Sequence, residues 1–342
     1  MKDNIEDYRK NGFIQLDQYF QNNPSYFTYP YYIDGYDEDN FWALVKKGGK
    51  EKYIYVKPRI NKEENTKYNT YSELVYSELL KQVGIDTASF DIAKFEGNDS
   101  TISPNILDDY SENLFIINGS ELLDGKRYFN TKISELDDLI DEIHNYARAE
   151  FIDKEQEEKA IEDIKKVCIA DIFTLTTDRS PHDFDFIVGK DECGKEILKL
   201  APLCHNTYAL GSNFSEEEIY DMLNDEDMLA DRVELCYSDT GVPESKRDLN
   251  YPYWEDTLYY LIEENKNMLD FARNCAIQMD LSKAINNVEE KIGVKIPIEY
   301  KEFMYEIWSN RLQNICECID IDYYKIIDKE NIEMEEILCQ IF

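Results

Sequence analysis

A short run that mixes carboxylates with basic residues, TTDRSPHDFDFIVG from residue 176 to 189, has side chains suited to phosphoryl transfer. Asp178 and Asp183 stand close together in it, with Arg179 and His182 between them. One such carboxylate can accept the proton of an attacking hydroxyl while the second binds a divalent metal ion. The alternative is an acidic turn without chemistry, in a chain with many acidic residues.

Two further segments supply the remaining groups that this chemistry needs, namely a lysine for the nucleotide phosphates and oxygen ligands for magnesium. Lys57 lies in the β-rich run YIYVKPR, and Glu73 lies near the start of the next helical segment, from where it can pair with Lys57. His205 and Asn206 follow an apolar run in LAPLCHNTYALG. Taken singly, Lys57 is more typical of a solvated lysine, and Glu73 of a helix-start carboxylate favoured by the helix dipole.

The first part of the chain must position Lys57 and Glu73, and its pattern predicts a small sheet with one helix. FWALVKK, the turn GGK and EKYIYVKPR predict a hairpin, and the apolar spacing of YSELVYSELLKQVG predicts a helix with Ser72 as N-cap and Gly84 after its end. The first thirty residues are expected to be irregular or an edge segment. Further short strands are predicted in IDTASFDIAKFEG, STISPNIL and NLFIING.

Beyond Gly125 the pattern changes to long periodic helices, TKISELDDLIDEIHNYARAEF and KEQEEKAIEDIKKVCIADIFTLTT. The loop with Asp178 follows them, then a strand, the turn DECGKE and a second strand, and from about Ser215 the chain is helical and acidic. The sequence therefore predicts an α+β protein of two lobes. Residues 1–120 form the β-rich, nucleotide-binding lobe, and residues 121–342 form the mainly helical, catalytic lobe.

The charge of the chain limits its partners. It has 37 basic and 72 acidic residues, a net charge of −35, and no dense basic run. Binding to a phosphate backbone needs clustered lysine and arginine, so nucleic acid is not expected as a direct partner. A basic protein would be attracted to such a surface. Simple solubility is the alternative explanation.

The remaining bulk features favour a cytoplasmic protein. The eight cysteines are scattered without a CxxC pair, which predicts reduced, small apolar side chains and no zinc cluster. No run of apolar residues is long enough to span a membrane. The segment MKDNIEDYRK lacks the apolar core of a signal peptide.

The order of these motifs resembles the HipA-like serine/threonine kinases, most closely the compact members that lack an extra N-terminal partner-binding segment. In that family the two loops typically read TDRHxxNWGF and LAPLFDNGxSL; this chain has TDRSPHDFDF at 177–186 and LAPLCHNTYAL at 200–210. YIYVKP, SELVYSELLKQVGI and STISPNILDDY resemble the strand with the lysine, the following helix and the segment that passes the adenine ring. The resemblance extends from about Gly35 to Gly211. It implies a protein-kinase-like fold with a small β-rich N-lobe and a larger helical C-lobe.

The resemblance also implies how ATP is held. Lys57 would bind the α- and β-phosphates, with Glu73 as its partner. Three residues of the adenine segment would line the base: Ile102, Ser103 and Asn105.

For the catalytic and metal groups, the resemblance implies Asp178 as the base and Arg179 as the brace of its loop. Asp183 stands where the family has a metal-binding asparagine and still offers a carboxylate oxygen. His205 stands where the family has its main magnesium-binding aspartate, with Asn206 beside it. Because Mg²⁺ prefers oxygen ligands, this change makes the metal motif degenerate and opens a role for Mn²⁺.

Two functions remain open from the sequence. The first is an ATP-dependent protein kinase that phosphorylates a protein hydroxyl with Mg²⁺ or Mn²⁺ as cofactor. The alternative is a catalytically impaired pseudokinase that acts as a nucleotide- or protein-binding module. The resemblance adds an antitoxin-type partner, which some relatives have, and no membrane association is expected.

Overall fold

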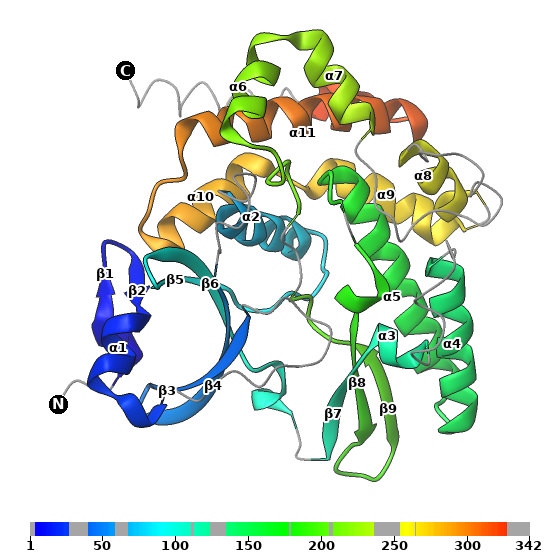
Figure 1. The fold of residues 1–342 in the computed structure, drawn as a ribbon. Helices are drawn as coiled ribbons and strands as arrows, with labels where there is room; N and C mark the ends of the chain where they lie inside the picture. The colour runs from blue at the N-terminus through cyan, green and yellow to red at the C-terminus, as the bar shows by residue number, and fades with distance from the viewer. Residues whose placement is uncertain are drawn as a thin grey trace.

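The computed structural model describes residues 4–26, 40–58, 68–110, 113–123, 135–177, 179–204, 208–235, 254–263 and 265–326. Figure 1 shows a β-rich part, blue to cyan, beside a larger, mostly helical part, green to red. Among the described residues, no helix has the length and apolarity needed to cross a membrane. The described cysteines form no disulfide.

The β-rich part is a six-stranded sheet in the order β1-β2-β5-β6-β4-β3. The hairpin of β3 and β4, at one edge of the sheet, joins the two strands predicted around GGK, and Gly48 and Gly49 make the turn with φ of +59° and +79°. Neighbouring strands are antiparallel except for β2 and β5. The strands are β1 (Arg9–Lys10), β2 (Phe13–Gln15), β3 (Phe41–Lys47), β4 (Lys50–Pro58), β5 (Asp91–Phe95) and β6 (Asn98–Pro104).

The sequence predicts an irregular or an edge segment here. For residues 4–26 the edge alternative is confirmed, since β1 is an outer strand of the sheet, and the irregular alternative is wrong. Besides β1 and β2, this stretch forms α1 (Leu16–Asn22) and two 3₁₀ turns, Ile5–Tyr8 and Pro24–Tyr26. This stretch is regular because its apolar residues are buried. Ile14, Leu16 and Tyr19 are inaccessible to solvent, and they pack with residues of β3 and β4 in the apolar cluster of the sheet. Residues 1–3 and 27–30 of the predicted segment lie outside the described residues.

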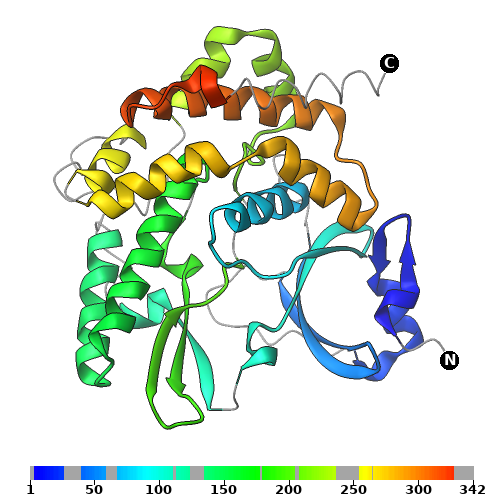
Figure 2. The ribbon, with the colours of Figure 1, turned by 180° about the vertical axis from the view of Figure 1, so that it is seen from behind.

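Helix α2 (Asn69–Gln82) begins four residues earlier than an N-cap at Ser72 predicts. Ser72 is therefore not the N-cap but lies inside the helix, where its Oγ donates to the Ala209 carbonyl at 2.6 Å. Gly84 follows the helix with φ of +78°, as predicted from its position. Helix α2 is buried on several sides, because it lies between the sheet and the C-terminal helix α10 (Leu281–Ile292), a position visible in Figures 1 and 2.

Both ends of α2 are fastened to the helical part. At the N-terminal end, the Tyr68 ring stacks on Tyr300 with 4.3 Å between the centroids. At the C-terminal end, the Gln82 side chain donates to the Asp280 carbonyl at 3.0 Å and accepts from the Asp280 N–H at 2.6 Å. The helix is thus held as a rigid element between the two parts.

The helical part carries a second, three-stranded sheet in the order β7-β8-β9. β7 (Leu114–Asn118) comes from the predicted strand NLFIING and pairs with β8 (Asp185–Lys190), which continues through the predicted turn into β9 (Glu196–Leu200). The division of the chain at residues 120 and 121 remains a prediction. The other helices are α3 (Gly119–Leu122), α4 (Glu135–Ala149), α5 (Lys154–Phe173), α6 (Glu216–Asn224), α7 (Glu226–Leu235), α8 (Trp254–Ile262), α9 (Lys266–Gln278) and α11 (Ile298–Cys318).

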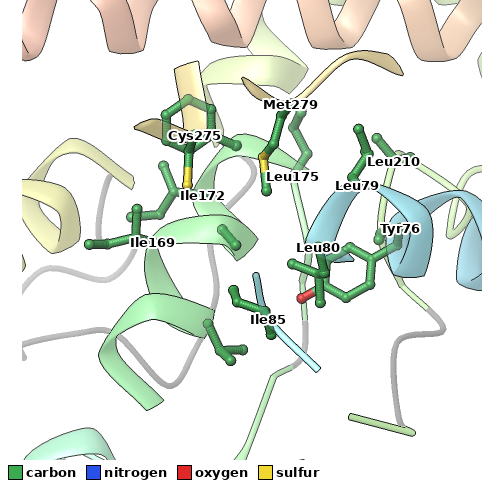
Figure 3. Close-up of a cluster of buried hydrophobic side chains, with 14 of the residues drawn as sticks. Tyr76, Leu79, Leu80, Ile85, Ile169, Ile172, Leu175, Leu210, Cys275 and Met279 are labelled. Carbon is green, nitrogen blue, oxygen red and sulfur yellow. The ribbon is translucent and has the colours of Figure 1, made fainter. Parts of the chain in front are cut away.

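One large apolar cluster connects the two parts. Figure 3 shows one cluster that contains Leu79 and Leu80 of α2, Ile169 and Ile172 of α5, and Met279, which follows α9. The backbone connects the parts as well, since the Ala88 N–H donates to the Leu203 carbonyl at 2.9 Å and the Leu203 N–H to the Asp86 carbonyl at 3.0 Å. The core therefore fixes where the strands and loops with polar motifs face one another.

Candidate active site

A buried ion pair joins the sheet to α2. The Lys57 ammonium near the end of β4 is paired with the Glu73 carboxylate, and both side chains are buried. Thr101, opposite Lys57 in β6, donates from its Oγ1 to the second Glu73 oxygen at 2.6 Å. Glu73 is thus satisfied on both oxygens, and it fixes the direction of the lysine.

Lys57 also reaches the other lobe. Its Nζ donates to the Cys204 carbonyl at 2.7 Å, and it lies 5.7 Å from the centre of the Phe90 ring. Cys204 is the residue immediately before the predicted metal residues 205 and 206. Lys57 therefore lies where the β-rich lobe meets LAPLCHNTYAL, residues 200–210. We call this stretch and TDRSPHDFDF, residues 177–186, the two signature stretches.

The loop after α5 is held by a buried network around Arg179. Its Nε and Nη2 donate to the two Asp171 oxygens at 2.9 and 3.0 Å, and Nη2 also donates to the Tyr76 hydroxyl at 2.9 Å. The Tyr76 hydroxyl in turn donates to Asp171 at 2.5 Å. Burial alone would lower the pKa of the Arg179 guanidinium, but the Asp171 carboxylate outweighs it and holds the pKa above its ordinary value.

The two signature stretches meet through backbone hydrogen bonds. The Thr177 N–H donates to the Tyr208 carbonyl at 3.1 Å, and the Leu210 N–H donates to the Thr174 carbonyl at 2.8 Å. These contacts flank the predicted residues Asp178, His205 and Asn206, which lie outside the described part of the chain.

Asp183 ends a short 3₁₀ turn, Pro181–Asp183, and caps it. Its Oδ2 accepts from the Ser180 N–H at 2.7 Å and from the Ser180 hydroxyl at 3.1 Å. Burial raises the pKa of Asp183, although the positive charges of Arg179 and Lys57 act in the opposite direction. The Asp183 carboxylate thus lies within the electrostatic influence of the lysine.

Asp185, the first residue of β8, has a polar setting of its own. Its Oδ1 accepts from the Asn118 amide at 2.9 Å, and its Oδ2 accepts from the Cys204 thiol at 3.5 Å. Burial raises the pKa of Asp185, opposed by those two hydrogen bonds, while the neighbouring Asp183 charge raises it further.

The three residues predicted to pass the adenine ring do not share one face. Ser103 pairs with Tyr55 across β6 and β4, on the face that carries Lys57. Ile102 points to the opposite face, into the apolar cluster behind the sheet. Asn105 follows β6, where its N–H donates to the Tyr53 carbonyl at 3.1 Å and its side chain caps a 3₁₀ turn, Ile106–Asp109.

The residue types at this junction fit a magnesium ion only in part. Asp183 and Asp185 offer carboxylate oxygens, the ligands that Mg²⁺ prefers. Within the described ranges, no three side chains of the metal-binding types lie close enough to hold an ion together. Further ligands therefore have to come from the nucleotide, from water or from residues outside those ranges.

Several side chains of the site were not expected from the sequence. Asp171 and Tyr76 hold Arg179, and Thr101 and Asn118 fix the orientations of Glu73 and Asp185. Of these residues, only Asp171 has a signal in the sequence, because it lies in the last turn of a helix just before a loop that contains an arginine. The others are joined to their partners only by the tertiary fold.

A small β-rich lobe and a larger helical lobe, with a lysine–glutamate pair between strand and helix, define a protein-kinase-like fold. No protein-family model and no curated protein matches the sequence. Among solved structures, the chain is similar to the Helicobacter pylori proinflammatory kinase CtkA, with a TM-score of 0.60 and 15% identity, over 86% of this chain and 93% of that one.

A second similar structure comes from the toxin–antitoxin system of Shewanella oneidensis MR-1, a complex of HipA, HipB and operator DNA. Here the TM-score is 0.50 and the identity 12%, over 94% of this chain and 73% of that one. The chain therefore has the two-lobed α+β fold of the HipA-like kinases, and the predicted fold class is confirmed. At these identities the likeness concerns the fold.

Proposed function

We propose that this protein is an ATP-dependent serine/threonine kinase that transfers a phosphoryl group to a protein hydroxyl. The observation that supports this most is the Lys57–Glu73 ion pair at the junction of the lobes, next to a loop anchored by Arg179. Phosphoryl transfer depends mainly on positioning and electrostatic stabilisation, which such fixed charges provide.

Each residue then has a defined task. Lys57 binds the α- and β-phosphates, and Glu73 fixes the direction of its ammonium group. Asp178 accepts the proton of the acceptor hydroxyl, whose oxygen forms the new bond to the γ-phosphorus while the bond to the leaving ADP breaks. Arg179, one residue further along, fixes the loop from which Asp178 acts.

Asp183 is the described residue best suited to a divalent cation, with His205 and Asn206 as ligands proposed from the family resemblance. When bound, Mg²⁺ or Mn²⁺ would neutralise charge on the phosphate oxygens. Manganese accepts a histidine nitrogen more readily than magnesium does, so His205 favours activity with Mn²⁺.

The acidic composition supports a basic protein as substrate, because opposite charges accelerate encounter. HipA is found with the antitoxin HipB in the Shewanella structure. An antitoxin-type partner is therefore proposed here as well, together with a cytoplasmic location, which rests on the sequence alone.

The test is transfer of labelled phosphate from ATP, measured with Mg²⁺ and with Mn²⁺, to the protein itself and to basic test proteins. Asp178→Asn should abolish the signal but leave nucleotide binding intact. Asp221→Asn, at an exposed position on α6, is the matched control and should behave like the parent protein. Absence of transfer with either metal from folded protein would refute the proposal.

A pseudokinase is the second candidate, favoured by His205 at the main metal position of the family motif. It predicts that ATP raises the melting temperature equally with and without a divalent metal, or not at all. A kinase should be stabilised more by ATP together with the metal than by ATP alone.

A further inference from the structure

The two outer edges of the sheet β7-β8-β9 differ from each other. Along β9 the edge is closed by a side chain. The Gln156 amide donates to the Glu196 carbonyl at 3.0 Å and accepts from the Leu198 N–H at 3.1 Å. It thus occupies the backbone groups with which a further strand would pair.

Along β7 the outward backbone groups are open. The Gly119 N–H donates to the Phe184 carbonyl at 2.7 Å, and hydrogen-bonded positions alternate in an antiparallel pair. The N–H and C=O groups of Leu114 and Ile116 therefore point away from β8. Within the described ranges, neither residue forms a hydrogen bond on that side. An edge of this kind is a template for the addition of a strand.

The apolar core covers one face of the sheet fully at β8 but not at β7. Phe186 and Val188 on β8 are inaccessible to solvent and belong to that core. Their partners across the strand pair, Ile117 and Phe115, lie on the same face. Ile117 is only half-buried, however, and Phe115 is 52% exposed. At β7 the described part of the chain therefore leaves this face partly uncovered.

A cavity adjoins the uncovered face. It has a volume of about 380 Å³ and lies between β7, α3 and the C-terminal half of α4, the helix that runs beside α5 in Figures 1 and 2. Ile117, Leu122 and Tyr146 contribute apolar surface, and Glu121 and Glu142 contribute carboxylates. None of the described residues that line it is a lysine or an arginine. The cavity therefore suits an apolar side chain with positive charges beside it.

The two carboxylates come from different helices. Glu121 on α3 is held at the end of β7, because its Oε2 accepts from the Asn118 N–H at 3.0 Å. Glu142 belongs to α4. The whole chain has a net charge of −35, so a second copy would be repelled and a basic segment attracted. The charge therefore favours a basic partner over a dimer of this chain.

We propose that β7 and this cavity bind an extended, basic segment of a partner protein, which adds a fourth strand to the sheet. Its backbone pairs with Leu114 and Ile116, and one of its apolar side chains enters the cavity. Basic side chains two positions away lie on the same face of the added strand and meet Glu121 and Glu142. None of these residues has a task in the proposed phosphoryl transfer, so the inference does not depend on that function.

The test uses two labelled peptides, Thr-Lys-Thr-Ile-Thr-Lys-Thr and its relative with phenylalanine at the centre. Binding to the full chain is measured by fluorescence anisotropy at about 150 mM salt, which screens distant charges. Glu142→Lys tests the cavity, and Asp141→Lys, at an exposed position of the same helix, is its matched control. Ile116→Pro removes an outward donor without removing a bond to β8, and Ile116→Val is its control. Thermal melting reports whether each variant is folded.

The expected result is that both peptides bind the parent protein and that Glu142→Lys and Ile116→Pro each weaken binding roughly tenfold. Asp141→Lys and Ile116→Val should bind like the parent. A fully N-methylated peptide, which keeps the side chains but has no backbone donors, should not bind, and it tests strand pairing even if Ile116→Pro does not fold.

Four outcomes would overturn the inference. Equal weakening by Asp141→Lys and Glu142→Lys would reduce the attraction to general charge. Unchanged binding of the N-methylated peptide would exclude strand addition. If light scattering showed a dimer of the parent that Ile116→Pro abolishes, a second copy would be the occupant of the edge. Absence of peptide binding to the folded parent would show that the edge and cavity are not a site for such a segment.

Discussion

The buried Lys57–Glu73 pair makes a quantitative prediction about stability. Lys57→Met removes the charge that compensates a carboxylate with no solvent exposure, and breaking a buried pair in this way typically costs about 3–5 kcal/mol. The hydrogen bond from Thr101 at 2.6 Å remains and continues to satisfy one Glu73 oxygen. We therefore expect a loss at the lower end of that range, about 3 kcal/mol.

The second substitution, Glu73→Gln, removes the charge that Lys57→Met leaves uncompensated. The double variant should then recover about 2 kcal/mol relative to the sum of the single changes, a coupling typical of residues in direct contact. Urea unfolding at pH 7 measures the free energy of unfolding of the parent protein, the two single variants and the double variant.

Lys52→Met is the control, since Lys52 lies on the same strand and forms a partly exposed pair with Asp108 at 3.4 Å. Such surface pairs contribute at most about 1 kcal/mol. Strictly additive changes, or a Lys57→Met cost no larger than that of Lys52→Met, would show that the buried pair does not stabilise the junction of the lobes.

Three further predictions concern positions around this junction. Asp171→Asn should cost about 3 kcal/mol in urea unfolding, because it leaves the Arg179 guanidinium buried without its counter-charge; an unchanged midpoint would rule out this anchor. Gly211→Ala should lower the free energy of unfolding by about 1–3 kcal/mol, since Gly211 has a φ of +67° and the new Cβ would lie 2.5 Å from the Phe303 ring. If adding Phe303→Leu to this variant removed the whole cost, contact with the ring would be its only cause and the positive φ would contribute nothing. Glu289 has a pKa lowered from 4.5, because two lysines outweigh the effect of burial, so its contribution is present above pH 4.5 and is lost as the pH falls through the folded pKa. The stability difference between Glu289→Gln and the parent should accordingly shrink on acidification in urea titrations, and a difference that grows would contradict this assignment.

Much of the architecture is readable from local patterns. The hairpin around Gly48 and Gly49, the helix that ends before Gly84 and the strands on either side of DECGKE follow from periodicity and turn residues. The pairing of Glu73 with Lys57 was expected from a strand lysine followed by a helix carboxylate, and the ion pair is present. Their roles toward ATP remain predictions.

The features that the sequence did not reveal depend on long-range packing. Residues 13–20 change from a strand to a helix within a few positions, so no single period is long enough to detect. Asp171 is one of 72 acidic residues, and only the fold shows that this carboxylate, unlike the more accessible carboxylates earlier in α5, faces Arg179. β7 was expected as one more strand of the first sheet, but strand pairing over long distances is not encoded in local periodicity.

The fastening of α2 at both of its ends limits how this protein can be regulated. A helix with one face open to solvent can rotate or slide and carry its carboxylate away from a lysine. Here Tyr68 and Gln82 secure the two ends to the helical lobe, so such a displacement would have to break the apolar core around Leu79 as well. On–off control by a shift of α2 is therefore disfavoured, and the amides of α2 should exchange with deuterium as slowly as those of the deepest core helices.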